Sequence, residues 1–222
     1  MSITSFNPPV RTLMGPGPSD VHPRVTGAMA RPCIGHLDPA FVGMMDEIKQ
    51  MLQYTFQTKN QLTIPVSAPG SAGMEATFMN LLEHGDKAIV CQNGVFGGRM
   101  KENVERCGAT AIMVQDDWGK PVDPQKVEDV LKANPDAKLV AFVHAETSTG
   151  ARSDAETISR IAHDIPTGDQ WYVKWISNRS SARVQAFCCV QVHIIALGIA
   201  HVANGVQTSQ SCHVMYKPSC LI

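Results

Sequence analysis

KLVAFVH, at residues 138–144, is the most strand-like run of the chain, because apolar side chains follow one another without interruption from Leu139 to Val143. Outward from this run, between residues 62 and 164, short apolar runs alternate with amphipathic stretches. The pattern predicts further strands at residues 62–68, 87–91 and 109–114, and helices at residues 72–83, 97–107, 124–133 and 153–164. Such alternation is typical of a parallel sheet with crossover helices, so we predict an α/β fold with a mostly parallel sheet.

Two of the predicted helices carry signals at their N-termini. Asp123 can cap the helix at residues 124–133, and Pro124 occupies its first turn, where a missing N–H is tolerated. The run SDAE at residues 153–156 resembles a capping box for the helix that begins there. In the helix at residues 72–83, four apolar side chains recur at helical spacing on one face, which we predict faces the core: Met74, Phe78, Leu81 and Leu82.

Composition narrows the class of protein. The 222 residues are 44% hydrophobic and 18% charged, with 19 Lys and Arg against 20 Asp and Glu, which is typical of a globular protein of net charge −1. A near-neutral chain without a basic run is a poor partner for nucleic acid. The longest apolar run, residues 192–202, is interrupted by His193 and His201 and is too short for a membrane span. We therefore expect neither nucleic acid nor membrane as a partner.

The N-terminal residues lack the apolar core of a signal peptide. We therefore expect the cytoplasm or another reducing compartment, in which the seven cysteines are thiols.

Charge divides the chain near Ile165. Residues 1–165 carry 15 basic and 19 acidic residues, a net charge of −4, whereas residues 166–222 carry four basic residues and one acid, a net charge of +3. Four of the seven cysteines also lie in these last 57 residues. We therefore treat residues 1–165 as one unit and residues 166–222 as an atypical tail.

Three segments that follow predicted strands carry candidate chemistry, since ligands of open α/β sheets bind at the carboxyl ends of the strands. The small residues at 69–73 open a helix, which suits either an anion site or tight packing. Phe96, beyond an Asn-Gly turn and next to glycines, is either a stacking platform or a core aromatic residue. The hydroxyl cluster at residues 147–149 either donates to a polar ligand or caps a turn.

These three segments, in this order and with GPGPS at residues 15–19, resemble the class-V aminotransferases of pyridoxal-phosphate fold type I. The resemblance covers residues 12–164 and is carried by SAGMEA, LLEHGDKAIV, NGVFGGR and HAETSTG. It implies that residues 1–165 form the N-terminal half of the large domain. It also implies pyridoxal 5′-phosphate as cofactor, a homodimer, and transfer of an amino group between alanine or serine and glyoxylate or a related 2-oxo acid.

The resemblance also assigns binding roles to individual residues. Gly70 and Ser71 would hold the cofactor phosphate, Phe96 would stack on the pyridine ring, and Thr147 would bond the phenolic oxygen. Gly17 would lie near the substrate. One departure is Pro69, which stands where many relatives have Ser or Thr.

Catalytic residues of the family are not found. Relatives carry an Asp that pairs with the pyridine nitrogen, in a motif resembling VDAVxSLGG, and a Schiff-base lysine in a motif resembling SGTQK. Neither motif occurs in this sequence. The tail lysines, Lys174 and Lys217, lie in YVKWI and MYKPS, which match nothing in the family. We assign no catalytic residue and expect this chain to be inactive.

The tail has two interpretations. Our hypothesis is that it was translated from an altered reading frame or a mispredicted gene end, because its composition changes where the resemblance stops. The alternative is a diverged natural C-terminus. Its Cys and His residues match no zinc-ligand spacing, so we expect no metal site at Cys188, Cys189, His193, Cys212 or His213.

Three alternative functions remain open from sequence. The chain could belong to another class-V transaminase, such as one acting on 2-aminoethylphosphonate. It could be a non-catalytic fragment that pairs with a full-length relative as a dimerisation decoy. A desulfurase that uses a tail cysteine as nucleophile is the third, although sulfur-transfer motifs are not recognisable.

Overall fold

The computed structural model describes residues 5–15, 20–56, 59, 61–165, 171–174 and 185–186. Six helices and seven strands lie in this part of the chain. In order they are α1 (Pro23–Met29), α2 (Pro39–Phe56), α3 (Gly70–Leu81), β1 (Lys87–Gln92), α4 (Val95–Arg106), β2 (Thr110–Gln115), α5 (Pro124–Ala133), β3 (Ala137–Phe142), β4 (Ala145–Glu146), β5 (Ala151–Arg152), α6 (Ala155–Asp164), β6 (Trp171–Lys174) and β7 (Gln185–Ala186).

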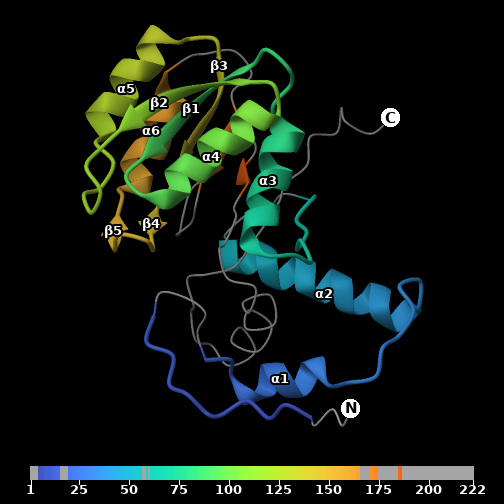
Figure 1. Cartoon of the computed structure of the whole chain (residues 1–222). Helices are drawn as coiled ribbons and strands as arrows, with labels where there is room; N and C mark the ends of the chain where they lie inside the picture. The colour runs from blue at the N-terminus through green and yellow to red at the C-terminus, as the bar shows by residue number, and fades with distance from the viewer. Residues whose placement is uncertain are drawn as a thin grey trace.

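Five strands form one parallel sheet in the order β2-β1-β3-β6-β7 (Figure 1). The central strands β1 and β3 are buried along almost their whole length, and β1 pairs residue by residue with β2 from Lys87↔Thr110 to Gln92↔Gln115. The short strands β4 and β5 form a separate antiparallel pair. The α/β prediction and the mostly parallel sheet are confirmed.

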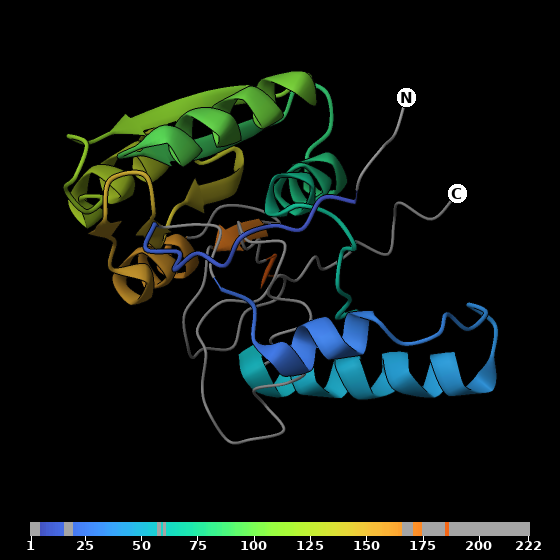
Figure 2. The same cartoon turned by 60° about the horizontal axis from the view of Figure 1, so that its bottom comes forward.

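Two helix layers cover the two faces of this sheet. Side chains of a strand alternate between faces, so β1 contributes Val90 to one layer and Ile89 to the other. Helices α3 and α4 pack on the Val90 face, and α5 and α6 pack on the Ile89 face. The four side chains predicted to face the core from the helix at residues 72–83 are all buried, although Leu82 lies just beyond the end of α3. In both Figure 1 and Figure 2, α2 lies outside these two layers.

The predicted strand at residues 62–68 is wrong. Ile64 makes a single bridge there, and the segment forms no strand. Pro65 explains this difference, because proline has no N–H to donate to a ladder. Helices α1 and α2 were not predicted from the spacing of apolar residues.

Some element ends also differ from the predictions. Helices α3 and α4 each begin two residues early, and β3 ends at Phe142, before the predicted end at His144. There the chain turns away from the sheet, because the His144 carbonyl accepts from the Ser153 N–H at 2.8 Å rather than from a strand.

The capping box predicted at Ser153 is wrong, because Asp154 caps α6. The Asp154 Oδ1 accepts from the Thr157 N–H at 3.1 Å. The Ser153 hydroxyl instead accepts from the Val122 N–H at 3.2 Å, across the sheet edge.

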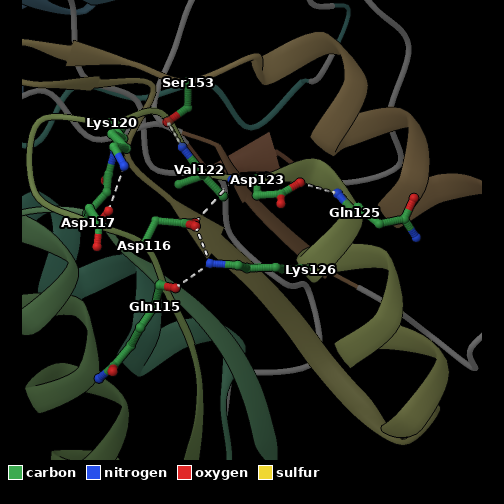
Figure 3. Close-up of polar contacts among 10 residues, drawn as sticks. Gln115, Asp116, Asp117, Lys120, Val122, Asp123, Gln125, Lys126 and Ser153 are labelled. Carbon is green, nitrogen blue, oxygen red and sulfur yellow. Dashed lines mark hydrogen bonds and ion pairs between the residues drawn. The ribbon is translucent and has the colours of Figure 1, made fainter.

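The N-terminus of α5 is closed by carboxylates, as Figure 3 shows. The predicted cap is confirmed, since Asp123 Oδ1 accepts from the Gln125 N–H at 2.9 Å. Asp116, directly after β2, accepts from the Asp123 N–H at 3.0 Å and pairs with Lys126 at 2.6 Å. The hydrogen bond to Asp116 raises the pKa of the Lys126 ammonium. This network fixes the start of α5 against the carboxyl end of the sheet.

Within the described residues, no helix combines the length and the apolar character needed to cross a bilayer.

Candidate functional site

The candidate site lies at the carboxyl ends of β1 and β3, at the lower edge of the sheet in Figure 1. Three segments contribute to it, namely the start of α3, the start of α4, and the turn between β4 and β5. This edge is where open parallel sheets bind ligands, because the strand ends and the helix N-termini meet there.

Helix α3 begins at Gly70 without a side-chain cap. Its N-cap residue, Pro69, makes no side-chain hydrogen bond, and the first turn carries no acidic residue. The Ser71 Oγ accepts from the Arg99 guanidinium at 3.3 Å. The positive end of this helix therefore faces a hydroxyl and a guanidinium, a donor-rich arrangement that suits an anion.

Helix α4 begins very differently, because a distant segment closes its N-terminus. Glu146 Oε2 accepts from the Phe96 N–H at 3.2 Å, and Ser148 Oγ accepts from the Val95 N–H at 3.1 Å. The other carboxylate oxygen of Glu146 accepts from the Ser148 N–H at 3.1 Å and from its hydroxyl at 2.6 Å. Only 1% of Glu146 is exposed. The predicted start of this helix at Gly97 is wrong because these acceptors extend it backward.

Glycine at position 94 permits this closure. A Cβ at Gly94 would lie 2.4 Å from the Glu146 Cγ, a distance that real contacts do not reach. Any side chain at this position would therefore displace the carboxylate from the helix end.

Phe96 is half-buried and packs against the core layer formed with α3. The Arg99 guanidinium lies 5.3 Å from the centre of its ring, within cation–π range. The two sequence interpretations of Phe96 are therefore compatible, because the ring contributes to packing and also lies at the site edge. Arg99, three residues on, joins this ring to Ser71.

Thr147 is half-buried in the turn between β4 and β5. The Glu146 carbonyl accepts from the N–H groups of Thr149 and Gly150, at 3.2 and 2.8 Å. Gly150 has a φ of 78°, a conformation that favours glycine, and so allows the chain to turn back into β5.

Two buried oxygen atoms have no hydrogen-bond partner among the described residues. They are Asn93 Oδ1, directly after β1, and Thr149 Oγ1, in the turn after β4. An unpaired buried oxygen atom is costly, and both of these atoms follow strands whose carboxyl ends lie at the candidate site.

Cys91 lies in β1, next to this edge, but does not supply a nucleophile. Burial raises the pKa of its thiol far above the usual value, which disfavours the thiolate that a nucleophile requires.

The structure connects several of the residues predicted from the sequence. Arg99 joins Ser71 to Phe96, and Glu146 joins the Phe96 backbone to the turn that holds Thr147. The sequence analysis missed both connecting residues. The signals were the spacing of Arg99 from Phe96, which puts them on one helix face, and a lone acid after the buried strand β3.

Several predicted positions lie outside the described residues. They are Gly17, Lys217 and the Cys and His residues considered for a metal site. Lys174 lies in β6, whose backbone alone is described.

Known proteins agree with this architecture. The model of the aminotransferase class-V family matches residues 22–168. The (S)-ureidoglycine–glyoxylate transaminase of Bacillus subtilis is 42% identical over 143 residues, which are 64% of this chain and 34% of that protein. The alanine–glyoxylate aminotransferase of Oryctolagus cuniculus is 41% identical over 155 residues, which are 70% of this chain and 39% of that protein.

A solved structure is also similar. The alanine–glyoxylate aminotransferase from Nostoc sp. has a TM-score of 0.73 and 38% identity, covering 78% of this chain and 45% of that one. The chain spans between a third and two fifths of the length of the two curated relatives. Its sheet and helices are part of the fold type I architecture. The predicted resemblance is confirmed, and the chain belongs to the class-V aminotransferase family.

Proposed function

We propose that this chain binds pyridoxal 5′-phosphate at the carboxyl edge of its sheet. We further propose that it derives from an aminotransferase acting between alanine or serine and glyoxylate or a related 2-oxo acid. Family membership supports the cofactor, since class-V aminotransferases are pyridoxal-phosphate enzymes. The names of both curated relatives support glyoxylate as the acceptor.

The observation that carries the proposal is the N-terminus of α3, which lacks a side-chain cap and lies beside Arg99. The groups around it, the Ser71 hydroxyl and the Arg99 guanidinium, can donate to a phosphate. Both oxygens of Glu146 accept hydrogen bonds at the start of α4 and in the following turn, so they are directed at donors other than those of α3. The chemistry of these donors fits the phosphate end of the cofactor.

The residues assigned to the cofactor then divide into phosphate-binding and ring-contacting groups. Gly70 and Ser71 would hold the phosphate at the start of α3. Phe96 would pack against the ring, and Thr147 would donate its hydroxyl proton to the phenolic oxygen. When bound, pyridoxal phosphate supplies a carbonyl that takes up an amino group and a ring that withdraws electron density.

Turnover also needs a lysine that moves the substrate proton and an acid that pairs with the ring nitrogen. The 222 residues contain neither family motif. We therefore propose that this chain binds the cofactor without covalent attachment and does not catalyse transamination by itself.

The test is a calorimetric titration of the purified chain with pyridoxal phosphate, pyridoxal and inorganic phosphate, followed by a pyruvate assay with alanine and glyoxylate. We expect binding of pyridoxal phosphate and phosphate, much weaker binding of pyridoxal, and no pyruvate. Absence of any pyridoxal-phosphate binding would refute the proposed cofactor. Turnover, with a borohydride-stable pyridoxyl group on Lys174 or Lys217, would refute the proposed inactivity.

A further inference from the structure

We propose that Glu146 is a positioning residue, which sets the spacing between the ring of Phe96 and the hydroxyl of Thr147. This inference rests on the proposed function, because its purpose is to hold the two groups that would contact the cofactor ring. Glu146 itself touches neither ring nor phosphate in this assignment. It acts through the backbone of the two segments that carry those groups.

The first step is the arrangement of donors around the carboxylate. Three donors converge on its two oxygens: the Phe96 N–H, the Ser148 N–H and the Ser148 hydroxyl. A carboxylate has acceptor sites for all three, whereas a glutamine offers one acceptor oxygen and an NH₂ group that cannot accept. Only 1% of Glu146 is exposed, so an amide group in place of its carboxylate would find little water to replace a lost hydrogen bond.

The second step is the sequence distance that these bonds span. The Phe96–Glu146 and Val95–Ser148 hydrogen bonds join residues that are 50 and 53 positions apart. Helices α5 and α6 are instead capped by the residue directly before them, Asp123 and Asp154. A local cap would have satisfied the first N–H groups of α4 in the same way. The distant acid additionally links the start of α4 to the turn between β4 and β5.

The third step is that Glu146 also defines the turn on its own side. Its carbonyl accepts from the N–H groups of Thr149 and Gly150, while its side chain binds Ser148. Thr147 lies between these bonded positions. The place of the Thr147 backbone relative to that of Phe96 is thus fixed through one buried residue.

The fourth step is the close approach at Gly94. Because a Cβ there would lie 2.4 Å from the Glu146 Cγ, the loop before α4 and the carboxylate are already in tight contact. The carboxylate therefore has little freedom to shift. A displacement of the start of α4 would also displace the turn between β4 and β5.

The experiment compares Glu146→Gln with Glu105→Gln, an exposed carboxylate on α4 that pairs with Lys101. Each full-length chain is titrated with pyridoxal phosphate and with inorganic phosphate. We expect Glu146→Gln to weaken pyridoxal-phosphate binding about tenfold or more, and phosphate binding by less than about twofold, because its hydrogen bonds go to Phe96 and Ser148 rather than to the groups around the phosphate. Glu105→Gln should change neither. A merely structural role would weaken both ligands equally.

A second pair of variants keeps the test decisive if Glu146→Gln does not fold. Ser148→Ala removes one hydroxyl that bridges Val95 and Glu146, at an exposed position. We expect it to weaken pyridoxal-phosphate binding about threefold to fivefold, again without an effect on phosphate. Combined with Thr147→Ala, its loss should be smaller than the product of the two single losses, because both act on one contact.

The outcomes separate the two proposals. If the wild-type chain does not bind pyridoxal phosphate, the proposed function fails. If it binds, and both Glu146→Gln and Ser148→Ala bind equally well or lose phosphate affinity to the same extent, the positioning role is overturned.

Discussion

The N-termini of α3 and α4 lie at the same edge of the sheet and differ in what faces them. The start of α4 is closed, since a buried glutamate and a serine accept its first N–H groups. The start of α3 has a proline as N-cap, no side-chain cap, and a guanidinium close to Ser71. Both helix ends carry the same partial positive charge. The difference is that side chains from a distant segment cap α4, whereas no side chain caps α3.

The two following helices extend this comparison. Carboxylates also cap α5 and α6, through Asp123 and Asp154. Among α3 to α6, the described helices that pack on the sheet, three therefore have N-termini satisfied by acids, while α3 does not. From this difference we expect changes at the starts of α4, α5 and α6 to alter stability. We expect an added charge at the start of α3 to alter phosphate binding.

The largest expected effect comes from forcing the closed end of α4 apart. Gly94→Ala would place a Cβ against Glu146, and we expect the free energy of unfolding to fall by about 2–3 kcal/mol. Urea denaturation followed by circular dichroism measures this loss. The control is Gly43→Ala in α2, where nothing lies within 4 Å of the new Cβ, and which should be neutral or slightly stabilising. Equal effects of the two substitutions would contradict the close approach.

The next effect concerns α5. Asp116→Ala removes the acceptor of the Asp123 N–H from a carboxylate that is only 8% exposed, and we expect a loss of about 1–2 kcal/mol in the free energy of unfolding. The matched control is Asp117→Ala, an exposed neighbour that pairs with Lys120 at 2.7 Å. If the control destabilises the chain as much, the buried carboxylate has no special part in fixing α5.

A side-chain cap can be added at the start of α3 by substitution of Pro69. Pro69→Asp adds a side-chain cap, and we expect a gain of about 1 kcal/mol in stability together with a loss of about tenfold in affinity for inorganic phosphate. Pro69→Ser adds a cap without charge and should keep phosphate binding. Thermal melts and calorimetric titrations measure the two quantities. Unchanged phosphate affinity in Pro69→Asp would place the anion elsewhere.

The smallest expected effect is the pH dependence of the α6 cap. Hydrogen bonds from the Thr157 N–H and hydroxyl lower the pKa of the Asp154 carboxyl in the folded chain. Its contribution to stability is therefore fully present above the unfolded-state pKa of about 4. This contribution is lost as the pH falls through the lower, folded-state pKa. Asp154→Ala should cost about 1 kcal/mol at pH 7 and progressively less below pH 4. A cost that does not change between pH 7 and pH 3 would contradict the assignment.

Much of the fold could be predicted from local patterns. The apolar runs of β1 and β3 and the one-sided spacing of Met74 and Phe78 found the sheet and its covering layer because burial depends directly on side-chain type. The strand at residues 62–68 was wrong because Pro65 interrupts the strand-forming residues Thr63, Ile64 and Val66. Ser153 was mistaken for a cap because its hydroxyl bonds to a segment 31 residues away.

The candidate site was only partly predictable. Gly70, Ser71, Phe96 and Thr147 came from a resemblance whose family is confirmed, while their individual roles stay predictions. The connecting residues Arg99 and Glu146 could not be found in the same way. Their importance depends on contacts that span 28 and 50 positions in the sequence.

The sequence by itself determined the family, the α/β class and the core-facing side of α3, since these follow from periodic burial and from local motifs. Only the tertiary structure decided that an acid 50 positions away in the sequence closes the start of α4. All four helices present the same backbone dipole, and what distinguishes them is whether a carboxylate, near or distant in sequence, reaches that end. Such a distant contact is a property of packing, so the isolated segments do not contain it.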